Sequence, residues 1–388
     1  MGRKVCVVVT ARPSYARIKT VLGALHRHPA VELQLVVAGS AIIERYGNVA
    51  SIMEQDGFSI TARVHSLLEG DTLVGAAKST GIGMSELTSV FEHLRPDIVV
   101  TIADRYETLA TAAAAAYSNV PLAHIQGGEI TGSIDEKVRH AVTKLADVHF
   151  VSTERAREYV LRMGEAPDRV FKTGCPSIDI ARNVLETPRP DFHPLERYGG
   201  VGPQLDLSQG FLIVMQHPVT TEISDTRLHL GETLEAVKAL DLPTLWFWPN
   251  VDAGSDTVSK MLRTEREYGH LEHVHFFRNM NPEDFLYTLL ACQCLIGNSS
   301  VGIRECSYLG VPTVNIGNRQ QFRERGRNVI DVPYNRRSII AAVERQIANG
   351  PHKRDDLYGD GTAGAKIADL LESESLSIEK HLSYADAL

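Results

Sequence analysis

The chain has 388 residues, of which 43% are hydrophobic and 23% charged, a composition typical of a soluble globular protein with apolar material for two domains. Its formal net charge of −8 argues against a nucleic-acid or anionic-membrane partner bound through bulk charge, and no apolar run reaches the roughly 18 residues of a membrane span. Five irregularly spaced cysteines, most of them in apolar runs, indicate buried reduced thiols of a cytoplasmic protein, with neither a disulfide framework nor a metal site.

Short apolar runs rich in Val and Ile alternate with longer amphipathic stretches in the N-terminal half. Strands are predicted at 4–10, 32–38, 62–65, 97–102, 122–125 and 148–151, and helices at 15–27, 72–94, 108–117 and 135–145. The strands are almost continuously apolar. This pattern favours a parallel sheet whose two faces are both covered by helices.

The β-α alternation is interrupted by a segment rich in proline and glycine and then resumes. The sequence therefore predicts a linker at 186–209 between an N-terminal Rossmann-like domain, 1–185, and a C-terminal one, 210–362, followed by a helix and tail, 363–388. Strands of the second domain are predicted at 211–215, 244–248, 273–277, 294–296, 313–316 and 329–331. The expected fold class is α/β, with two doubly wound domains and ligands outside the carboxyl ends of the strands.

Charged residues follow two predicted strands of the first domain. In "TARPSYARIK" a strand ends before Arg12, and the stretch closes on Lys19; a guanidinium beside a helix start suits a phosphate or carboxylate, or it simply faces solvent. In "IADRYETLA" Asp104 and Arg105 stand between a strand and a helix. Asp104 could cap that helix or act as a general base.

The stretch "HIQGGEITGSIDEKVRHA" concentrates charge after the next strand. Its glycines allow the backbone to approach a ligand closely. Glu129 lies in the loop, Asp135 and Glu136 open the next helix, and Arg139 and His140 follow one turn later. Helix capping explains only one of the three carboxylates, so this stretch is a candidate for catalysis and substrate binding.

Two stretches of the second domain have the residue types of a nucleotide site. In "MQHPVTT" His217 is either a functional side chain at the end of a strand or a structural histidine. In "IGNSSVGIRECSYLGVP" free N–H groups and the hydroxyls of Ser299 and Ser300 at a predicted helix start suit an anion. Glu305 could accept the hydroxyls of a ribose, and Arg319 could neutralise a second phosphate. Together these features indicate a nucleotide sugar and acid/base chemistry on its sugar.

Several long motifs resemble one family. The stretches "RPDIVVTIADRYETLA", "GGEITGSIDEKVRHAVTKLA", "GCPSID", "MQHPVTT", "GNSSVGIRE" and "VPTVNIGNRQ" are similar to those of hydrolysing UDP-N-acetylglucosamine 2-epimerases of sialic-acid-type pathways, including the epimerase half of the bifunctional animal epimerase/kinase. The resemblance runs from about Val5 to Gly361. It implies a GT-B-like fold with an interdomain cleft, a UDP-sugar substrate, no cofactor, and a homodimer or homotetramer.

The resemblance also implies a reaction and residue roles. The C2 proton is removed, UDP is eliminated to leave a glycal, and water adds with inversion to release free N-acetylmannosamine. Asp104, Asp135 and His217 match catalytic positions, with His217 as general acid or diphosphate partner, and Arg105 lies near the diphosphate or sugar. The residues implied to hold UDP, with the backbone near Met280 against the base, are Arg12, Asn250, Ser299, Ser300, Glu305 and Arg319.

One position departs from the family pattern. Gln126 stands where the animal relatives have a glutamate proposed to act at C2, and an amide can neither abstract nor deliver a proton. Either Glu129 or Asp135 takes that task, or the sugar is a different one, such as a 2,4-diacetamido-trideoxy sugar. Other readings are a non-hydrolysing epimerase, a GT-B glycosyltransferase, which needs an acceptor groove, and a non-catalytic nucleotide-sugar sensor.

Overall fold

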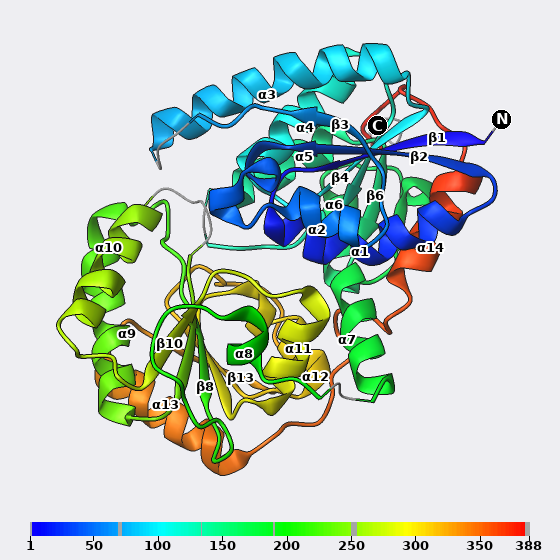
Figure 1. Ribbon diagram of the computed structural model, residues 1–388. Coiled ribbons are helices and arrows are strands. Elements are labelled where there is room, and N and C mark those ends of the chain that lie inside the picture. The colour runs from blue at the N-terminus through cyan, green and yellow to red at the C-terminus, as the bar shows by residue number, and fades with distance from the viewer. Residues whose placement is uncertain (1, 69–71, 133, 189–190, 250–253, 385–388) are drawn as a thin grey trace. The chain divides into compact units, whose positions relative to one another are not determined.

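The computed structural model describes residues 2–68, 72–132, 134–188, 191–249 and 254–384, and the chain divides into two compact units. The N-terminal unit comprises residues 1–130, 134–180 and 358–388. The C-terminal unit comprises residues 131–133 and 181–357. Each unit contains one open parallel sheet with its own hydrophobic core (Figure 1).

The N-terminal unit has a seven-stranded parallel sheet with the order β3-β2-β1-β4-β5-β6-β7. The sheet order reverses direction between β1 and β4, which makes this the topological switch point where open α/β sheets bind ligands. The strands are β1 (Arg3–Val9), β2 (Val31–Ala38), β3 (Ile60–Val64), β4 (Ile98–Ile102), β5 (Leu122–Ile125), β6 (Val148–Val151) and β7 (Val170–Lys172).

Helices cover both faces of this sheet, as the apolar strands require. Alternate residues of β1 point to opposite faces: Val5 and Val7 belong to a core with α1, α2 and α14, while Cys6 and Val8 belong to a core with α3, α4 and α5 (Figure 1). The helices of the unit are α1 (Arg12–Arg27), α2 (Val49–Gln55), α3 (Leu73–Leu94), α4 (Tyr106–Tyr117), α5 (Asp135–Leu145), α6 (Glu154–Arg162) and α14 (Ala363–Ser373).

The C-terminal unit has a six-stranded parallel sheet with the order β10-β9-β8-β11-β12-β13, and its switch point lies between β8 and β11. The strands are β8 (Leu212–Met215), β9 (Thr244–Phe247), β10 (Val274–Phe277), β11 (Cys294–Gly297), β12 (Thr313–Ile316) and β13 (Val329–Val332). The helices are α8 (Pro194–Tyr198), α9 (Thr226–Leu240), α10 (Ser255–Glu267), α11 (Pro282–Ala291), α12 (Glu305–Leu309) and α13 (Arg336–Asn349).

The units divide the chain at other residues than the sequence pattern indicates. The division falls inside α7 (Pro176–Glu186), and the segment 186–209 contains α8 and an antiparallel bridge between Val201 and Phe276. From Tyr358 the chain belongs to the N-terminal unit again. There α14 packs on α1 and buries Ala363, Ile367 and Leu371, which is the reason for its apolar stripe.

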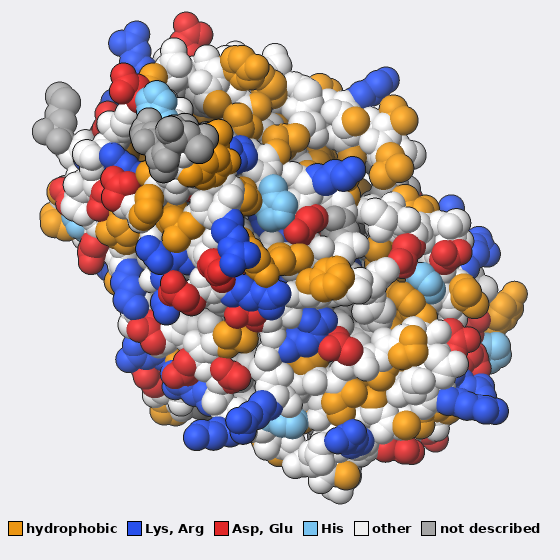
Figure 2. Space-filling model, turned by 180° about the vertical axis from the view of Figure 1, so that it is seen from behind, with side chains coloured by type: hydrophobic (Ala, Val, Ile, Leu, Met, Phe, Trp, Pro, Cys, Tyr) orange, Lys and Arg blue, Asp and Glu red, His pale blue; other side chains and the backbone are white. Residues whose placement is uncertain are grey.

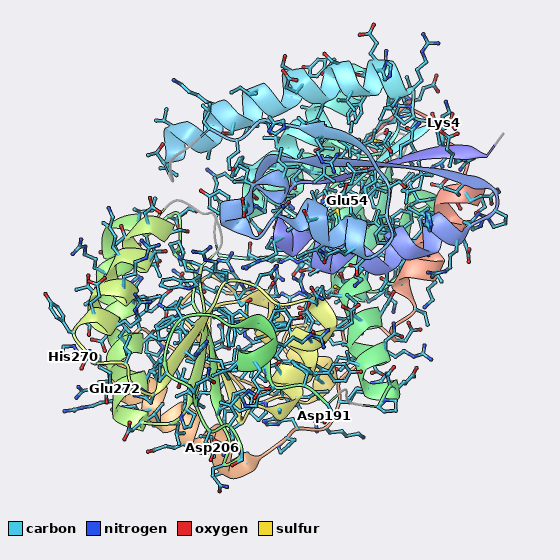
Figure 3. The ribbon with its side chains drawn as sticks, viewed as in Figure 1. Lys4, Glu54, Asp191, Asp206, His270 and Glu272 are labelled. Carbon is cyan, nitrogen blue, oxygen red and sulfur yellow. The ribbon has the colours of Figure 1, made fainter. Side chains whose placement is uncertain are left out.

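The surface carries mixed charge. Basic and acidic side chains are interspersed over the face in Figure 2, and exposed charged residues such as Asp206 and Glu272 point away from the ribbon in Figure 3. All five cysteines are buried and free. Within the described ranges, no helix is both long enough and apolar enough to cross a membrane.

Candidate active site

The switch point of the N-terminal sheet brings two guanidinium groups together. Arg12 is the first residue of α1, directly after β1, and Arg105 precedes α4, directly after the neighbouring strand β4. Burial and the positive charge of Arg105 lower the pKa of Arg12 to about 10. Arg105 also forms an ion pair with Glu107, whose Oε2 lies 3.2 Å from its Nε, so one carboxylate already balances part of this positive charge.

Asp104 forms an ion pair with a residue of α5. The N-cap residue of α4 is Arg105, whose side chain makes no capping bond. The carboxylate of Asp104 pairs with the guanidinium of Arg139, a side chain that is only 1% exposed. This ion pair orients the carboxylate of Asp104 toward α5.

Arg139 connects several acidic groups of this site. Its Nη1 donates to the carbonyl oxygen of Glu129 at 2.6 Å and to Oε2 of Glu136 at 3.0 Å. Burial alone would lower the pKa of Arg139, but the charges of Asp104, Glu129 and Glu136 raise it above its ordinary value. The guanidinium therefore stays charged and holds these loops in one arrangement.

The backbone leaves β4 in a strained conformation immediately before Asp104. Ala103 has φ +69°, a region that residues with a Cβ rarely adopt. Its carbonyl oxygen lies 2.8 Å from Nε2 of the buried His124, and Nδ1 of His124 lies 3.2 Å from Oγ1 of Thr143. Burial lowers the pKa of His124 to about 3. The neutral ring therefore donates from Nε2 to the Ala103 carbonyl and accepts from Thr143.

Gln126 also has a left-handed backbone, with φ +68°, at the end of β5. Its Nε2 donates to Sγ of Cys175 at 2.9 Å, and that sulfur lies 3.0 Å from Oγ of Ser177. Close by in sequence, Oε1 of the buried Glu129 accepts from Oγ of Ser152 at 3.1 Å. Gln126 thus contributes only hydrogen bonds at the end of β5. Glu129 contributes a carboxylate.

Two further candidates of the N-terminal unit occupy different places. Asp135 is the first residue of α5, four residues before Arg139, so both lie on the same face of that helix. Lys19 lies two turns into α1, where its Nζ forms an ion pair with Oδ2 of Asp56 at 3.0 Å. Lys19 therefore pairs with the residue that follows α2.

At the switch point of the C-terminal sheet, Asn298 clamps the backbone of His217. His217 follows β8 and is 4% exposed, and Asn298 follows β11 and is fully buried. The Asn298 side chain accepts from the backbone N–H of His217 at 2.8 Å and donates to its carbonyl oxygen at 2.8 Å. The position of His217 is thus fixed by a two-bond contact between neighbouring loops.

The loop after β11 is not the helix start that the sequence pattern favours. Ser300–Gly302 forms one 3₁₀ turn, η5, and the helix α12 begins only at Glu305. Ser299 caps this turn by accepting from the N–H of Val301 at 3.4 Å. The turn is tight because Gly302 lies against Thr313, where a Cβ would fall 2.6 Å from its side chain.

Buried charged residues surround this loop. Arg304, 1% exposed, donates from Nη2 to Oγ of Ser300 at 2.8 Å. Glu305 is 6% exposed, and its buried Oε2 makes no hydrogen bond to any part of the chain that the structure describes. A buried carboxylate oxygen of this kind is costly unless it receives a donor, and a hydroxyl group would supply one.

The remaining candidates of the C-terminal unit are placed as follows. Arg319, after β12, donates from Nη1 to the carbonyl oxygen of Asn298 at 3.1 Å, and Gln320 donates to the same oxygen at 2.9 Å. Met280, after β10, is 5% exposed. Asn250 lies outside the described residues.

Four residues of these networks did not stand out in the sequence: His124, Asn298, Arg304 and Tyr334. Asn298 and Arg304 lie inside a quoted motif, and an asparagine can pair with a backbone N–H and C=O at once, which is the one available signal. Tyr334, which follows β13, lies near the Asn298 side chain. Among the described residues, no cluster of three or more His, Cys, Asp or Glu side chains could hold a metal ion.

Comparisons with known proteins agree with this fold. The family described as UDP-N-acetylglucosamine 2-epimerase matches residues 23–372. The chain is 31% identical over 373 residues to the UDP-N,N'-diacetylbacillosamine 2-epimerase (hydrolyzing) of Legionella pneumophila, covering 96% of both proteins. It is 32% identical over 346 residues to polysialic acid biosynthesis protein P7 of Escherichia coli, covering 88% of this chain and 85% of that protein.

A solved structure confirms the predicted fold class. The UDP-GlcNAc 2-epimerase of Neisseria meningitidis, crystallised with UDP-GlcNAc, has a TM-score of 0.76 to this chain at 18% identity, covering 95% of this chain and 99% of that one. At this identity the comparison shows the fold alone. It is a GT-B-like pair of open, parallel α/β domains.

Proposed function

Because this chain belongs to the UDP-N-acetylglucosamine 2-epimerase family, we propose that it is a hydrolysing 2-epimerase, which converts a UDP-linked 2-acetamido sugar into the free C2 epimer and UDP. The observation that carries this proposal is the arrangement at the N-terminal switch point, where Asp104 is held by the buried Arg139 beside the Arg12 and Arg105 guanidinium groups. It combines carboxylates for proton transfer with cations for a leaving diphosphate.

The proposed reaction has two stages. A base removes the proton from C2, the C1–O bond breaks, and UDP leaves with the bonding electron pair, so that a C1–C2 double bond forms. Water then adds its oxygen to C1, and a proton returns to C2 on the opposite face. The sum is UDP-sugar plus water to epimerised free sugar plus UDP, so no redox cofactor is required.

Carboxylates of the N-terminal unit would act at the sugar. Since Gln126 cannot transfer a proton, we assign the C2 base to Asp135, with Glu129 as the alternative. Asp135 lies on the helix face that presents Arg139, and Arg139 in turn orients Asp104. Glu129 is more buried than Asp135, which makes it the weaker candidate.

The C-terminal unit would hold the nucleotide. Ser299 and Ser300 with the buried Arg304 would bind a phosphate, and Oε2 of Glu305 would accept the ribose hydroxyls. His217, fixed by Asn298, would donate a proton or a hydrogen bond to the departing diphosphate. Arg12, Arg105 and Arg319 supply further positive charge for the same leaving group.

UDP-N-acetylglucosamine is the substrate we propose first, for a pathway of sialic-acid type. A UDP-2,4-diacetamido-trideoxy sugar is the second candidate, and the 31% identity to an enzyme described as acting on UDP-N,N'-diacetylbacillosamine favours it specifically. Both substrates share the 2-acetamido group, the C2 hydrogen and the UDP leaving group, and so both fit the same chemistry.

Product analysis tests the proposal. Purified protein is incubated separately with the two UDP-sugars, and nucleotides and free sugars are separated and identified by mass spectrometry and NMR. Release of free UDP together with the free 2-epimer supports the proposal. The UDP-sugar that is converted with the much higher kcat/KM is then the substrate. An epimer that still carries UDP would identify a non-hydrolysing enzyme. Binding of UDP without turnover of either sugar would identify a nucleotide-sugar sensor.

A further inference from the structure

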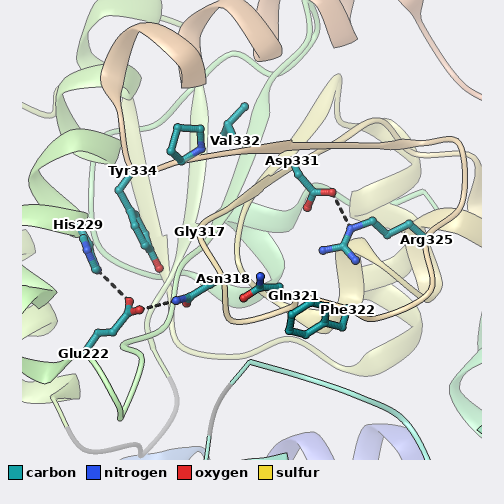
Figure 4. Close-up of a pocket in the computed structure, with 11 residues that line it drawn as sticks. Glu222, His229, Gly317, Asn318, Gln321, Phe322, Arg325, Asp331, Val332 and Tyr334 are labelled. Carbon is teal, nitrogen blue, oxygen red and sulfur yellow. Dashed lines mark hydrogen bonds and ion pairs between the residues drawn. The ribbon is translucent and has the colours of Figure 1, made fainter.

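The C-terminal unit contains a cavity beside the loop that holds His217. It measures about 660 Å³ and opens between the segments that follow β8, β12 and β13 (Figure 4). This volume is within the range of small-molecule sites in proteins. None of the residues assigned above to UDP or to catalysis lines it.

One side of the cavity is polar and carries more negative than positive charge. Glu222 accepts from the side chain of Asn318, and Asp331 accepts from Asn315 at 2.7 Å and pairs with Nε of Arg325 at 2.7 Å (Figure 4). The Asp331 side chain is 48% exposed and retains lone pairs for further donors, whereas Glu222 is 26% exposed and its buried Oε2 lies 3.7 Å from Nδ1 of His229. Two carboxylates against one guanidinium disfavour phosphates and carboxylate ligands.

The other side of the cavity is apolar and preorganised. The Tyr334 ring stacks on the His229 ring with centroids 3.6 Å apart and an interplanar angle of 5°. A Cβ at Gly317 would fall 2.3 Å from the Tyr334 ring, so only glycine leaves room for it. Val332 also lines this side (Figure 4).

Phe322 stands at the rim in an unusual conformation. It is 60% exposed and has φ +67°, a backbone region that costs a phenylalanine about 1 kcal/mol or more. Asparagine or glycine would occupy this position without that cost. An aromatic ring kept exposed and strained beside a cavity indicates a ligand contact.

Hydroxyl-accepting carboxylates beside an aromatic wall match a pyranose, whose hydroxyls donate hydrogen bonds and whose C–H face is apolar. We propose that this cavity binds a neutral 2-acetamido sugar without its nucleotide, the class of product released by the proposed reaction. Sugar hydroxyls and the acetamido N–H donate to Glu222 and Asp331, and the ring face and methyl group pack on Tyr334 and Phe322. The inference rests on the proposed function for the identity of the sugar.

A ligand in this cavity would affect the loop that contains His217. The hydroxyl of Tyr334 lies near the side chain of Asn298, which clamps the backbone of His217. Burial, together with the negative charge of Glu222, raises the pKa of Tyr334 to about 12, so this hydroxyl stays protonated. A sugar packed on Tyr334 would therefore be separated from Asn298, the residue that fixes His217, by Tyr334 alone.

Saturation-transfer NMR on the full chain tests the proposal. The probes are N-acetylmannosamine and N-acetylglucosamine, measured with and without saturating UDP, and N-acetylneuraminic acid as the charged comparison. We expect transfer to the neutral sugars that persists when UDP is bound, and none to the charged sugar. Loss of the signal on adding UDP, an equal signal from the charged sugar, or no signal from the neutral sugars would overturn the proposal.

A matched pair of variants locates the signal. Phe322→Asn removes the aromatic rim and relieves the left-handed strain, so the variant should fold at least as stably and bind the neutral sugar about tenfold more weakly. Tyr268→Asn changes another exposed aromatic residue of the same unit, 70% exposed, and should leave sugar binding unchanged. Equal effects of both variants would refute the assignment. UDP affinity, measured calorimetrically in the same samples, reports on the proposed function separately.

Discussion

Replacing Asn298 by alanine should destabilise the C-terminal unit more than almost any other polar substitution. The asparagine is fully buried and makes two 2.8 Å hydrogen bonds to the backbone of His217. Without it, one N–H and one C=O stay buried without partners, at about 1–3 kcal/mol each. With partial relaxation, the free energy of unfolding should fall by about 2–4 kcal/mol.

Intrinsic fluorescence can measure this change in one unit alone. Both tryptophans of the chain, Trp246 and Trp248, belong to the C-terminal unit, and Trp246 is fully buried in β9. Urea unfolding followed by tryptophan emission therefore reports on the C-terminal unit. Asn349→Ala, at an exposed position at the end of α13, is the control and should shift the free energy by less than about 0.5 kcal/mol.

The result that refutes this reasoning is simple to recognise. If Asn298→Ala and Asn349→Ala lower the free energy of unfolding equally, the backbone clamp on His217 contributes nothing. If Asn298→Ala greatly lowers the free energy of unfolding but leaves UDP affinity unchanged, the clamp serves stability and does not position the loop that contains His217.

Three further predictions concern single groups. Asp104→Asn should lower kcat by about 10²–10⁴-fold and leave calorimetric UDP affinity within about twofold, and a large loss of UDP affinity would contradict its assignment to the sugar. Glu305→Gln should weaken UDP binding by about tenfold and uracil binding hardly at all, since only the ribose contact changes. Because burial lowers the pKa of His124 to about 3, below its ordinary 6.5, the unfolded chain binds more protons between these values. The stability of the N-terminal unit should thus fall as the pH drops from 6.5 toward 3. Urea unfolding followed by hydrogen exchange of peptides from this unit measures the change, and a stability that does not vary with pH would contradict the prediction.

Most strands were predictable because buried parallel strands are nearly continuous apolar runs. The runs that became β5, β6 and β12 have the predicted boundaries. β7 was not predicted, because its three residues, Val170–Lys172, are too short to show a pattern. The order of the strands in the sheet was not predictable, because no local sequence pattern indicates that β1 lies next to β4 and not next to β3.

The site was predictable as a set of loops but not as a set of contacts. Residues after strands were the right places to look, because the carboxyl ends of parallel strands meet at one edge. A strand-end carboxylate before a helix has the same local sequence whether it caps or pairs. The ion pair of Asp104 with Arg139 joins residues 35 positions apart, which no local pattern shows. Likewise, the clamp between Asn298 and His217 joins residues 81 positions apart.

The central claim is that UDP leaves by elimination at the sugar and that water then adds to C1. The most direct test is turnover of UDP-N-acetylglucosamine, or of the diacetamido sugar if that is the substrate, in D2O and separately in ¹⁸O-labelled water. The account predicts a free 2-epimer with deuterium at C2 and UDP without ¹⁸O on its β-phosphate. Retained hydrogen at C2, or ¹⁸O in the released UDP, would mean direct hydrolysis at phosphorus or another route and would contradict it.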